Sequence, residues 1–79
     1  MSTRRYIVRS GADLARTLAE ARREGGLTQA EVAERARLDR TYLARMEAGH
    51  IVQQVDRALE VLRTLGVRVV AEQDVDDDG

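Results

Sequence analysis

The chain has 79 residues, of which 43% are hydrophobic and 34% charged, and its formal net charge is −1. This length allows one hydrophobic core worth about 3–5 kcal/mol, so support from a partner chain is expected. The lack of cysteine excludes disulfides and thiolate metal sites, and one histidine cannot build a zinc site. No apolar run approaches the roughly 18–20 residues of a membrane span. We therefore expect a cytoplasmic protein with no cofactor, no metal and no membrane association.

The charges are distributed unevenly. Residues 1–50 carry ten arginines against seven acidic residues, whereas residues 51–79 carry three arginines against seven acidic residues. This asymmetry indicates that the basic part, residues 1–50, binds nucleic acid and that the acidic part, residues 51–79, has a different role.

Residues 1–9 form a basic N-terminal arm. Tyr6–Val8 within it favours an extended or β conformation. We interpret this segment as a solvated arm, with contact to a DNA minor groove as the alternative.

A first helix is expected to begin after Ser10 and to end at the glycine pair Gly25-Gly26. Ser10 can cap its N-terminus, with Asp13 three residues further on, and glycine is the usual helix stop. Apolar residues recur at helical spacing on one face. The expected inward residues are Leu14, Leu18 and Ala21.

Two short helices are expected next. Thr28 and Glu31 form a T-x-x-E capping box that opens the second helix, and Asp39 is a good N-cap for the third, which Gly49 ends. The expected inward residues are Val32, Ala33 and Ala36 in the second helix and Leu43 and Met46 in the third, with Leu38 filling the turn between them.

A fourth helix is expected over residues 54–65. Its expected inward residues are Val55, Leu59, Leu62 and Leu65, and Gly66 is its stop.

After Gly66 the helical spacing of apolar residues ends. Residues 67–71 are rich in β-branched side chains and too few for a helix, so they predict a strand. A single strand has no ladder of its own, so it must pair with Tyr6–Val8, with a partner chain, or with both. We favour a partner chain, since an unpaired apolar edge is a liability. Residues 67–72 are therefore assigned as a dimerisation strand acting through Val67, Val69 and Val70, and residues 73–79 as a disordered acidic tail.

Two short helices joined by a short turn, the second with exposed arginines, indicate a helix-turn-helix. If Leu43 and Met46 face inward, the opposite face of the third helix reads bases. Arginine can bond bidentately to guanine, and small side chains can contact a thymine methyl group. The candidate base-contacting residues are Arg40, Thr41, Ala44 and Arg45.

The stretch 26–50, with Leu-Thr-Gln, Glu-Val-Ala, Tyr-Leu and Met-Glu-Ala-Gly in register, resembles the phage-repressor and Cro type of helix-turn-helix, the XRE family. The resemblance implies a mainly α fold, a lambda-repressor-like domain of four to five helices, here over residues 10–72 with a short C-terminal strand. The layout from Tyr6 to Glu72 is also similar to HipB-like antitoxins.

The resemblance also implies roles for single residues. Gln29 matches a phosphate-binding position, Tyr42 lies near the DNA backbone, and Arg22 and Glu47 match a structural ion pair. Arg37 stands where the family usually has glycine, so a positive φ is expected at a non-glycine residue. The loop after Gly49 lacks basic residues, which predicts fewer phosphate contacts. The full set assigned to phosphates is Thr28, Gln29, Tyr42 and His50.

The function expected from these observations is sequence-specific binding of double-stranded DNA by a homodimer that represses its own promoter at an inverted repeat. One alternative is a HipB-like antitoxin that neutralises a HipA-type kinase toxin by direct binding, and another is an RNA- or protein-binding adaptor. No Ser–His–acid arrangement, phosphate loop or carboxylate pair is visible, so an enzyme is not expected.

Overall fold

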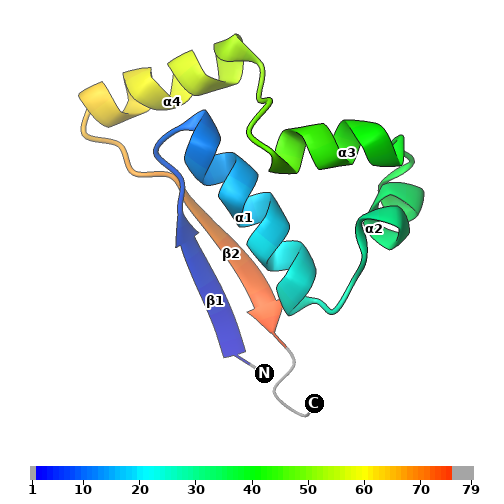
Figure 1. Ribbon diagram of the computed structural model, residues 1–79. Coiled ribbons are helices and arrows are strands. Elements are labelled where there is room, and N and C mark those ends of the chain that lie inside the picture. The colour runs from blue at the N-terminus through cyan, green and yellow to red at the C-terminus, as the bar shows by residue number, and fades with distance from the viewer. Residues whose placement is uncertain (1, 76–79) are drawn as a thin grey trace.

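The computed structural model describes residues 2–75 as helices and strands around a central helix. Helix α1 lies between a small sheet on one side and the α2–α3 pair on the other, and α4 lies near the start of α1 (Figure 1). This mainly helical arrangement with a C-terminal strand confirms the expected fold class. The elements are β1 (Ser2–Ile7), α1 (Gly11–Glu24), α2 (Gln29–Ala36), α3 (Arg40–Glu47), α4 (Gln53–Thr64) and β2 (Val70–Val75).

The first three helices begin at the caps that the sequence predicts. Ser10 Oγ accepts a hydrogen bond from the Asp13 N–H at 3.1 Å. Thr28 and Glu31 form the reciprocal capping box, with distances of 3.1 and 2.9 Å. Asp39 accepts from the Thr41 N–H at 2.8 Å. These bonds satisfy N–H groups that a helix leaves without internal partners.

The sheet corrects three expectations. The segment assigned as a solvated arm is β1, which pairs antiparallel with β2 in a register that joins Ile7 to Val70 and Ser2 to Val75. The C-terminal strand therefore begins three residues later than expected, and Val67 and Val69 precede it. Residues 73–75, assigned to a disordered tail, belong to the strand. Residues 76–79 of that tail lie outside the described part of the chain.

Side chains on the inner face of the sheet fix this register. Tyr6 is buried against the helices, and its hydroxyl donates to Gln73 Oε1 at 2.9 Å. Gln73 Nε2 in turn donates to the carbonyl of Ala21 near the end of α1, at 2.8 Å. A one-residue slip of β1 would turn Tyr6 to solvent and break its bond to Gln73, and a slip of β2 would turn Gln73 away from both of its partners, so the pairing is well specified.

The core is small and consists largely of small side chains. Ala15 and Ala19 form the most buried face of α1, whereas Leu14 and Leu18, expected to be fully inward, are half-buried. Alanine permits the close approach of neighbouring elements, and the leucines lie beside an open hollow instead. The buried apolar residues are Tyr6, Val8, Ala15, Ala19, Ala33 and Leu43.

The turn region and α4 are more exposed than expected. Ala36 and Leu38 are exposed, so Leu38 does not fill the turn. No residue of α4 is buried, and Leu65, just past its end, is 70% exposed. Among the described elements α4 packs mainly on α1, which leaves much of its surface uncovered.

Candidate nucleic-acid interface

Helix α3 is held to the core along one line of residues. Leu43 is 4% exposed, and the Glu47 side chain, one turn later, is 6% exposed. Because successive residues are about 100° apart around a helix, Thr41 and Arg45 lie on the side opposite this line. Both are exposed. The outermost surface of α3 is therefore a threonine and an arginine one turn apart.

The other two candidate base-contacting residues lie on one flank of α3. Arg40 is exposed and Ala44 is half-buried, and the two share a line about 100° from Thr41 and Arg45. Arg40 lines an open hollow together with Thr28 and Gln29 at the start of α2. This placement suits contact with the DNA backbone as well as with a base edge.

The turn between α2 and α3 is built on a left-handed residue. Arg37 has φ 58° and ψ 43°, which confirms the positive φ expected where the family has glycine. Its N–H donates to the Glu34 carbonyl at 3.2 Å, and the Leu38 N–H donates to the Ala33 carbonyl at 2.8 Å. These bonds close the end of α2 and set the direction of the chain into α3.

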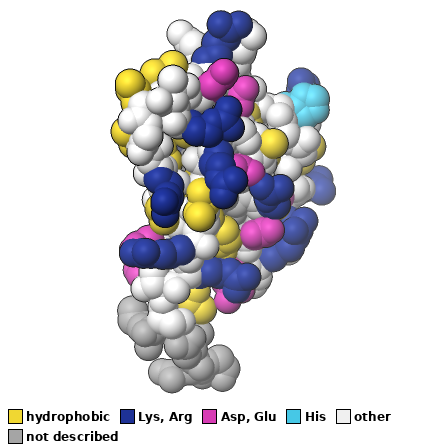
Figure 2. Space-filling model, turned by 90° about the vertical axis from the view of Figure 1, so that its left-hand side faces the viewer, with side chains coloured by type: hydrophobic (Ala, Val, Ile, Leu, Met, Phe, Trp, Pro, Cys, Tyr) yellow, Lys and Arg dark blue, Asp and Glu magenta, His cyan; other side chains and the backbone are white. Residues whose placement is uncertain are grey.

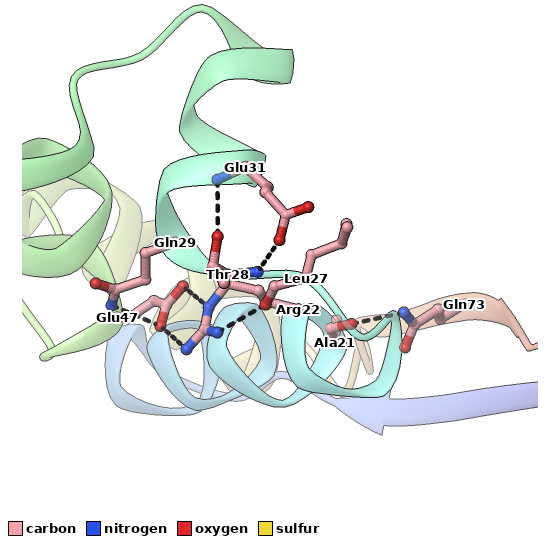
Figure 3. Close-up of polar contacts among 8 residues, drawn as sticks. All are labelled: Ala21, Arg22, Leu27, Thr28, Gln29, Glu31, Glu47 and Gln73. Carbon is pink, nitrogen blue, oxygen red and sulfur yellow. Dashed lines mark hydrogen bonds and ion pairs between the residues drawn. The ribbon is translucent and has the colours of Figure 1, made fainter.

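An ion pair joins α1 to the end of α3 (Figure 3). Arg22 Nε and Nη2 donate to the two carboxylate oxygens of Glu47 at 2.8 and 3.0 Å, and Arg22 Nη1 donates to the Leu27 carbonyl at 3.0 Å. The Arg22 side chain is 14% exposed. The pair expected from the resemblance is thus present, and its bidentate geometry and low exposure make it part of the structure.

Gln29 joins the same network, which the sequence did not predict. Its Nε2 donates to Glu47 Oε1 at 3.1 Å, so α2 and α3 are linked through this carboxylate. An amide nitrogen carries two hydrogens, and the second remains available to a ligand. Gln29 is therefore positioned by Glu47 while keeping a donor for a phosphate oxygen.

The network shifts the ionisation of both charged partners in the same sense. The hydrogen bonds from Arg22 lower the pKa of Glu47, although burial opposes this shift. The hydrogen bond to Glu47 raises the pKa of Arg22. Both changes favour the charged forms, so the pair stays ionised at neutral pH.

The N-terminus of α2 can accept an anion. Within the described residues, the backbone N–H groups of Gln29 and Ala30 have no hydrogen-bond partner. They open onto the hollow that Arg22 and Arg40 also line. Free N–H groups and the positive end of a helix dipole, together with an arginine, are what a phosphate group requires.

The remaining two residues assigned to phosphates lie elsewhere. Tyr42, which is 55% exposed, and His50 line a separate hollow with Met46, on the flank of α3 opposite Arg40. The structure therefore divides the expected phosphate set into two places, one on each side of the outward face of α3.

Two further arginines lie on this unit and were not among the sequence-based candidates. Arg35 and Arg37 are exposed at the end of α2, and no described acidic side chain forms an ion pair with either. The sequence signal that could have found them is the run of arginines at positions 35, 37 and 40 around the turn. With Arg40 and Arg45 they make four exposed arginines on the α2–α3 unit, against the exposed acids Glu31, Glu34 and Asp39.

Comparison with known proteins agrees with this geometry. A family model described as helix-turn-helix matches residues 18–70, which include α2, α3, α4 and the second half of α1. No curated protein and no solved structure gives a match.

No helix in residues 2–75 is long and apolar enough to cross a bilayer.

Proposed function

The chain belongs to the helix-turn-helix family, whose members are DNA-binding regulators, and from that premise we propose that it is a sequence-specific transcriptional repressor. In this proposal it binds an inverted-repeat operator as a homodimer and represses its own promoter. The observation that carries the proposal is the outward face of α3, where the exposed Thr41 and Arg45 lie between two hollows, one lined by Gln29 and Arg40 and the other by Tyr42 and His50.

Helix α3 would enter the major groove and read bases. Arg45 has no described ion-pair partner, so its guanidinium is free to bond to guanine O6 and N7. Thr41 and Ala44 would contact bases through short side chains that allow the helix to approach closely. Arg40 would bond at the groove edge, either to a base or to the adjoining phosphate.

Phosphate contacts on both sides would hold α3 in place. Thr28, Gln29 and the start of α2 would bind one strand, and Tyr42 and His50 would lie against the other. Such contacts position the protein without reading sequence. Because the second place has no arginine, the affinity is expected to depend less steeply on salt than for a domain with basic residues at both.

The homodimer is supported by apolar surface that the single chain leaves open. Val61, Val67 and Val70 are 57%, 47% and 41% exposed, in addition to the exposed Leu65. Exposed large apolar side chains are available for burial against a partner, which supports an interaction site on this small domain. A two-fold dimer would place its two α3 helices in successive major grooves, with half-sites about 34 Å apart.

Footprinting on the promoter of the chain's own gene tests this proposal. We expect protection of two symmetric half-sites about one helical turn apart, and competition by duplex DNA but not by RNA. Equal competition by RNA would favour the adaptor function instead. Protection of a single site, or none, would contradict the dimeric repressor.

A second candidate function is that of an antitoxin, similar to HipB, that neutralises a kinase toxin by direct binding. The exposed apolar surface at Val61 and Leu65 favours it, because it is available to another protein as well as to a second copy. The test is co-purification of the chain with the product of the neighbouring gene, together with toxicity of that product when it is expressed alone.

A further inference from the structure

The last turn of α1 is attached both to the sheet and to the α2–α3 unit. The carbonyl of Ala21 accepts a hydrogen bond from Gln73 of β2 at 2.8 Å. The next residue, Arg22, donates to Glu47 at the end of α3, also at 2.8 Å. Figure 3 shows Gln73 on one side of Ala21, and Arg22 with Glu47 on the other. Two consecutive residues of α1 therefore connect a strand to the helix that would read the bases.

Gln73 is held in one orientation by its two partners. Its side chain is half-buried, and the hydroxyl of Tyr6, a residue that is 9% exposed, donates to its Oε1 at 2.9 Å. A carbonyl group can only accept hydrogen bonds, so the amide nitrogen must face Ala21 and the amide oxygen must face Tyr6. The contact between Gln73 and α1 is therefore directional, unlike apolar packing, and it fixes where the end of α1 lies on the sheet.

The other contacts that hold the end of α1 to the sheet are weaker. Arg4 of β1 pairs with Glu24 at 3.1 Å, but the two side chains are 53% and 31% exposed, and such pairs contribute little. Figure 2 views the molecule from the side on which β1 lies and shows arginine and acidic side chains next to each other at the surface. The buried side chains of α1, Ala15 and Ala19, are small and interlock little with their neighbours. We therefore expect Gln73 to be the main polar restraint on this end of the helix.

Loss of this restraint would leave α1 itself intact. The Ala21 carbonyl also accepts from the Gly25 N–H at 3.1 Å, at the end of the helix, so Gln73 uses its second lone pair. Helix ends fray when nothing outside the helix holds them. Without the Gln73 amide, the last turn would keep its internal bond but would be free to move relative to the sheet. Arg22 lies on that turn and would move with it.

We propose that Gln73 is a positioning residue for DNA binding. By holding the last turn of α1 it fixes Arg22, whose side chain bonds to Glu47 and, at 3.0 Å, to the carbonyl of Leu27 just before α2. Glu47 in turn holds Gln29 at 3.1 Å. The strand that carries Gln73 lies on the side of α1 away from α2 and α3, so it acts through these contacts rather than on DNA (Figure 1). The inference rests on the DNA binding of the proposed function and is independent of the dimer.

The affinity for a duplex from the chain's own promoter, measured by fluorescence anisotropy, is the first test. Q73M keeps the length of the side chain and removes both of its bonds, and Q73E keeps an acceptor for Tyr6 but places a negative charge against the Ala21 carbonyl. Each should raise the dissociation constant about fivefold. Y6F leaves the bond between Gln73 and Ala21 in place and should raise it less than about twofold.

The matched control for this test is E72Q. Glu72 is the preceding residue of β2, is exposed, and pairs with Arg5 instead of contacting α1. E72Q should change the dissociation constant by less than about twofold. Normal binding by Q73M and Q73E, or an equal loss in E72Q, would overturn the inference alone. A wild-type chain that binds no duplex would refute the proposed function together with it.

A double-mutant cycle separates positioning from a general loss of folded protein. If Gln73 acts through Gln29, the variant Q29A/Q73M should lose at least about threefold less affinity than the product of the two single losses. In the cycle of Q73M with R35A, an exposed arginine outside this network, the two losses should multiply to within about twofold. A substitution that only lowered the folded fraction would give multiplying losses in both cycles, and this result would overturn the inference.

Hydrogen exchange at Arg22 provides a measurement without DNA. The Nε–H of Arg22 is bonded to Glu47 in a side chain that is 14% exposed, so it is protected from exchange with water. In proton–nitrogen NMR spectra, Q73M should raise its exchange rate about fivefold, whereas the backbone N–H of Leu43 should exchange as in the wild type. An unchanged rate at Arg22 would overturn the inference even if the DNA affinity fell, because the loss would not then pass through Arg22. An equal increase at Leu43 would overturn it as well, since the whole fold would then be loosened.

Discussion

Gln29 at the start of α2 donates a hydrogen bond across 3.1 Å to Glu47, the last residue of α3. The two helices of the helix-turn-helix are therefore joined at the same carboxylate that holds Arg22 of α1. The helix that would read the bases and the residue that would bind phosphate thus share one anchor. A phosphate contact at Gln29, if made as proposed, would therefore also set the position of α3 in the groove.

Substitution of Gln29 should weaken binding to all DNA sequences alike. Gln29→Ala removes one donor to phosphate, and a neutral hydrogen bond contributes about 1 kcal/mol, or roughly fivefold in affinity. Gln29→Glu should weaken binding further, because it places a negative charge beside Glu47 and beside the phosphate. Fluorescence anisotropy with operator and scrambled duplexes measures both effects. A loss confined to the operator would contradict a phosphate role.

Breaking the Arg22–Glu47 pair should destabilise the fold. Arg22→Ala leaves a carboxylate that is 6% exposed without its partner, which costs about 2–3 kcal/mol. Arg23→Ala, at the exposed neighbouring residue, is the matched control and should change the free energy of unfolding by less than about 0.5 kcal/mol. Urea denaturation measures both values. Equal effects of the two substitutions would show that the pair contributes nothing.

The same pair predicts a stability that falls in acid. The pKa of Glu47 is lowered in the folded chain. Ionised Glu47 therefore makes its full contribution to the free energy of unfolding above the ordinary glutamate pKa near 4.5. It is lost as the pH falls through the lower folded value. Glu47→Gln should therefore destabilise the protein at pH 6 and much less at pH 3. A difference between the two proteins that does not change with pH would exclude this ionisation as the cause.

The turn predicts a stabilising substitution. Arg37 adopts a left-handed conformation at φ 58°, which costs an ordinary residue about 1 kcal/mol and glycine almost nothing. Arg37→Gly should therefore raise the free energy of unfolding by about 0.5 kcal/mol after the greater entropy of unfolded glycine is subtracted. Arg35→Gly, inside α2, is the control and should lower it by about 1 kcal/mol. Thermal unfolding of both variants shows whether Arg37→Gly stabilises the fold and Arg35→Gly destabilises it.

Local signals in the sequence predicted much of this structure, and long-range pairing accounts for what they missed. The capping box of Thr28 and Glu31 and the positive φ of Arg37 depend on residues within a few positions, so the sequence shows them directly. The start of β2 at Val70 depends on β1, which is more than sixty residues away. β-Branched side chains at Val67 and Val69 indicate a strand, but only the partner strand decides where its ladder begins.

The candidate site shows the same limit. The exposed face of α3 followed from the spacing of Leu43 and Met46, because helical periodicity is local. The bond between Gln29 and Glu47 did not, because it joins two helices across a turn. The division of the phosphate set, with Gln29 and Tyr42 on opposite flanks of α3, likewise requires the orientation of the helix about its own axis.

Arg45 should determine base preference. It lies on the outermost line of α3 without a described ion-pair partner, so its loss removes a base contact and leaves the phosphate-binding places intact. Arg45→Ala should reduce discrimination at one operator position by about 1–3 kcal/mol. Binding to a panel of single-base operator variants measures this loss, and Arg35→Ala on α2 is the control, expected to weaken all sequences alike. If Arg45→Ala and Gln29→Ala produced the same uniform loss at every operator position, Arg45 would be a backbone contact, and base reading would have to be assigned to Arg40 and Thr41.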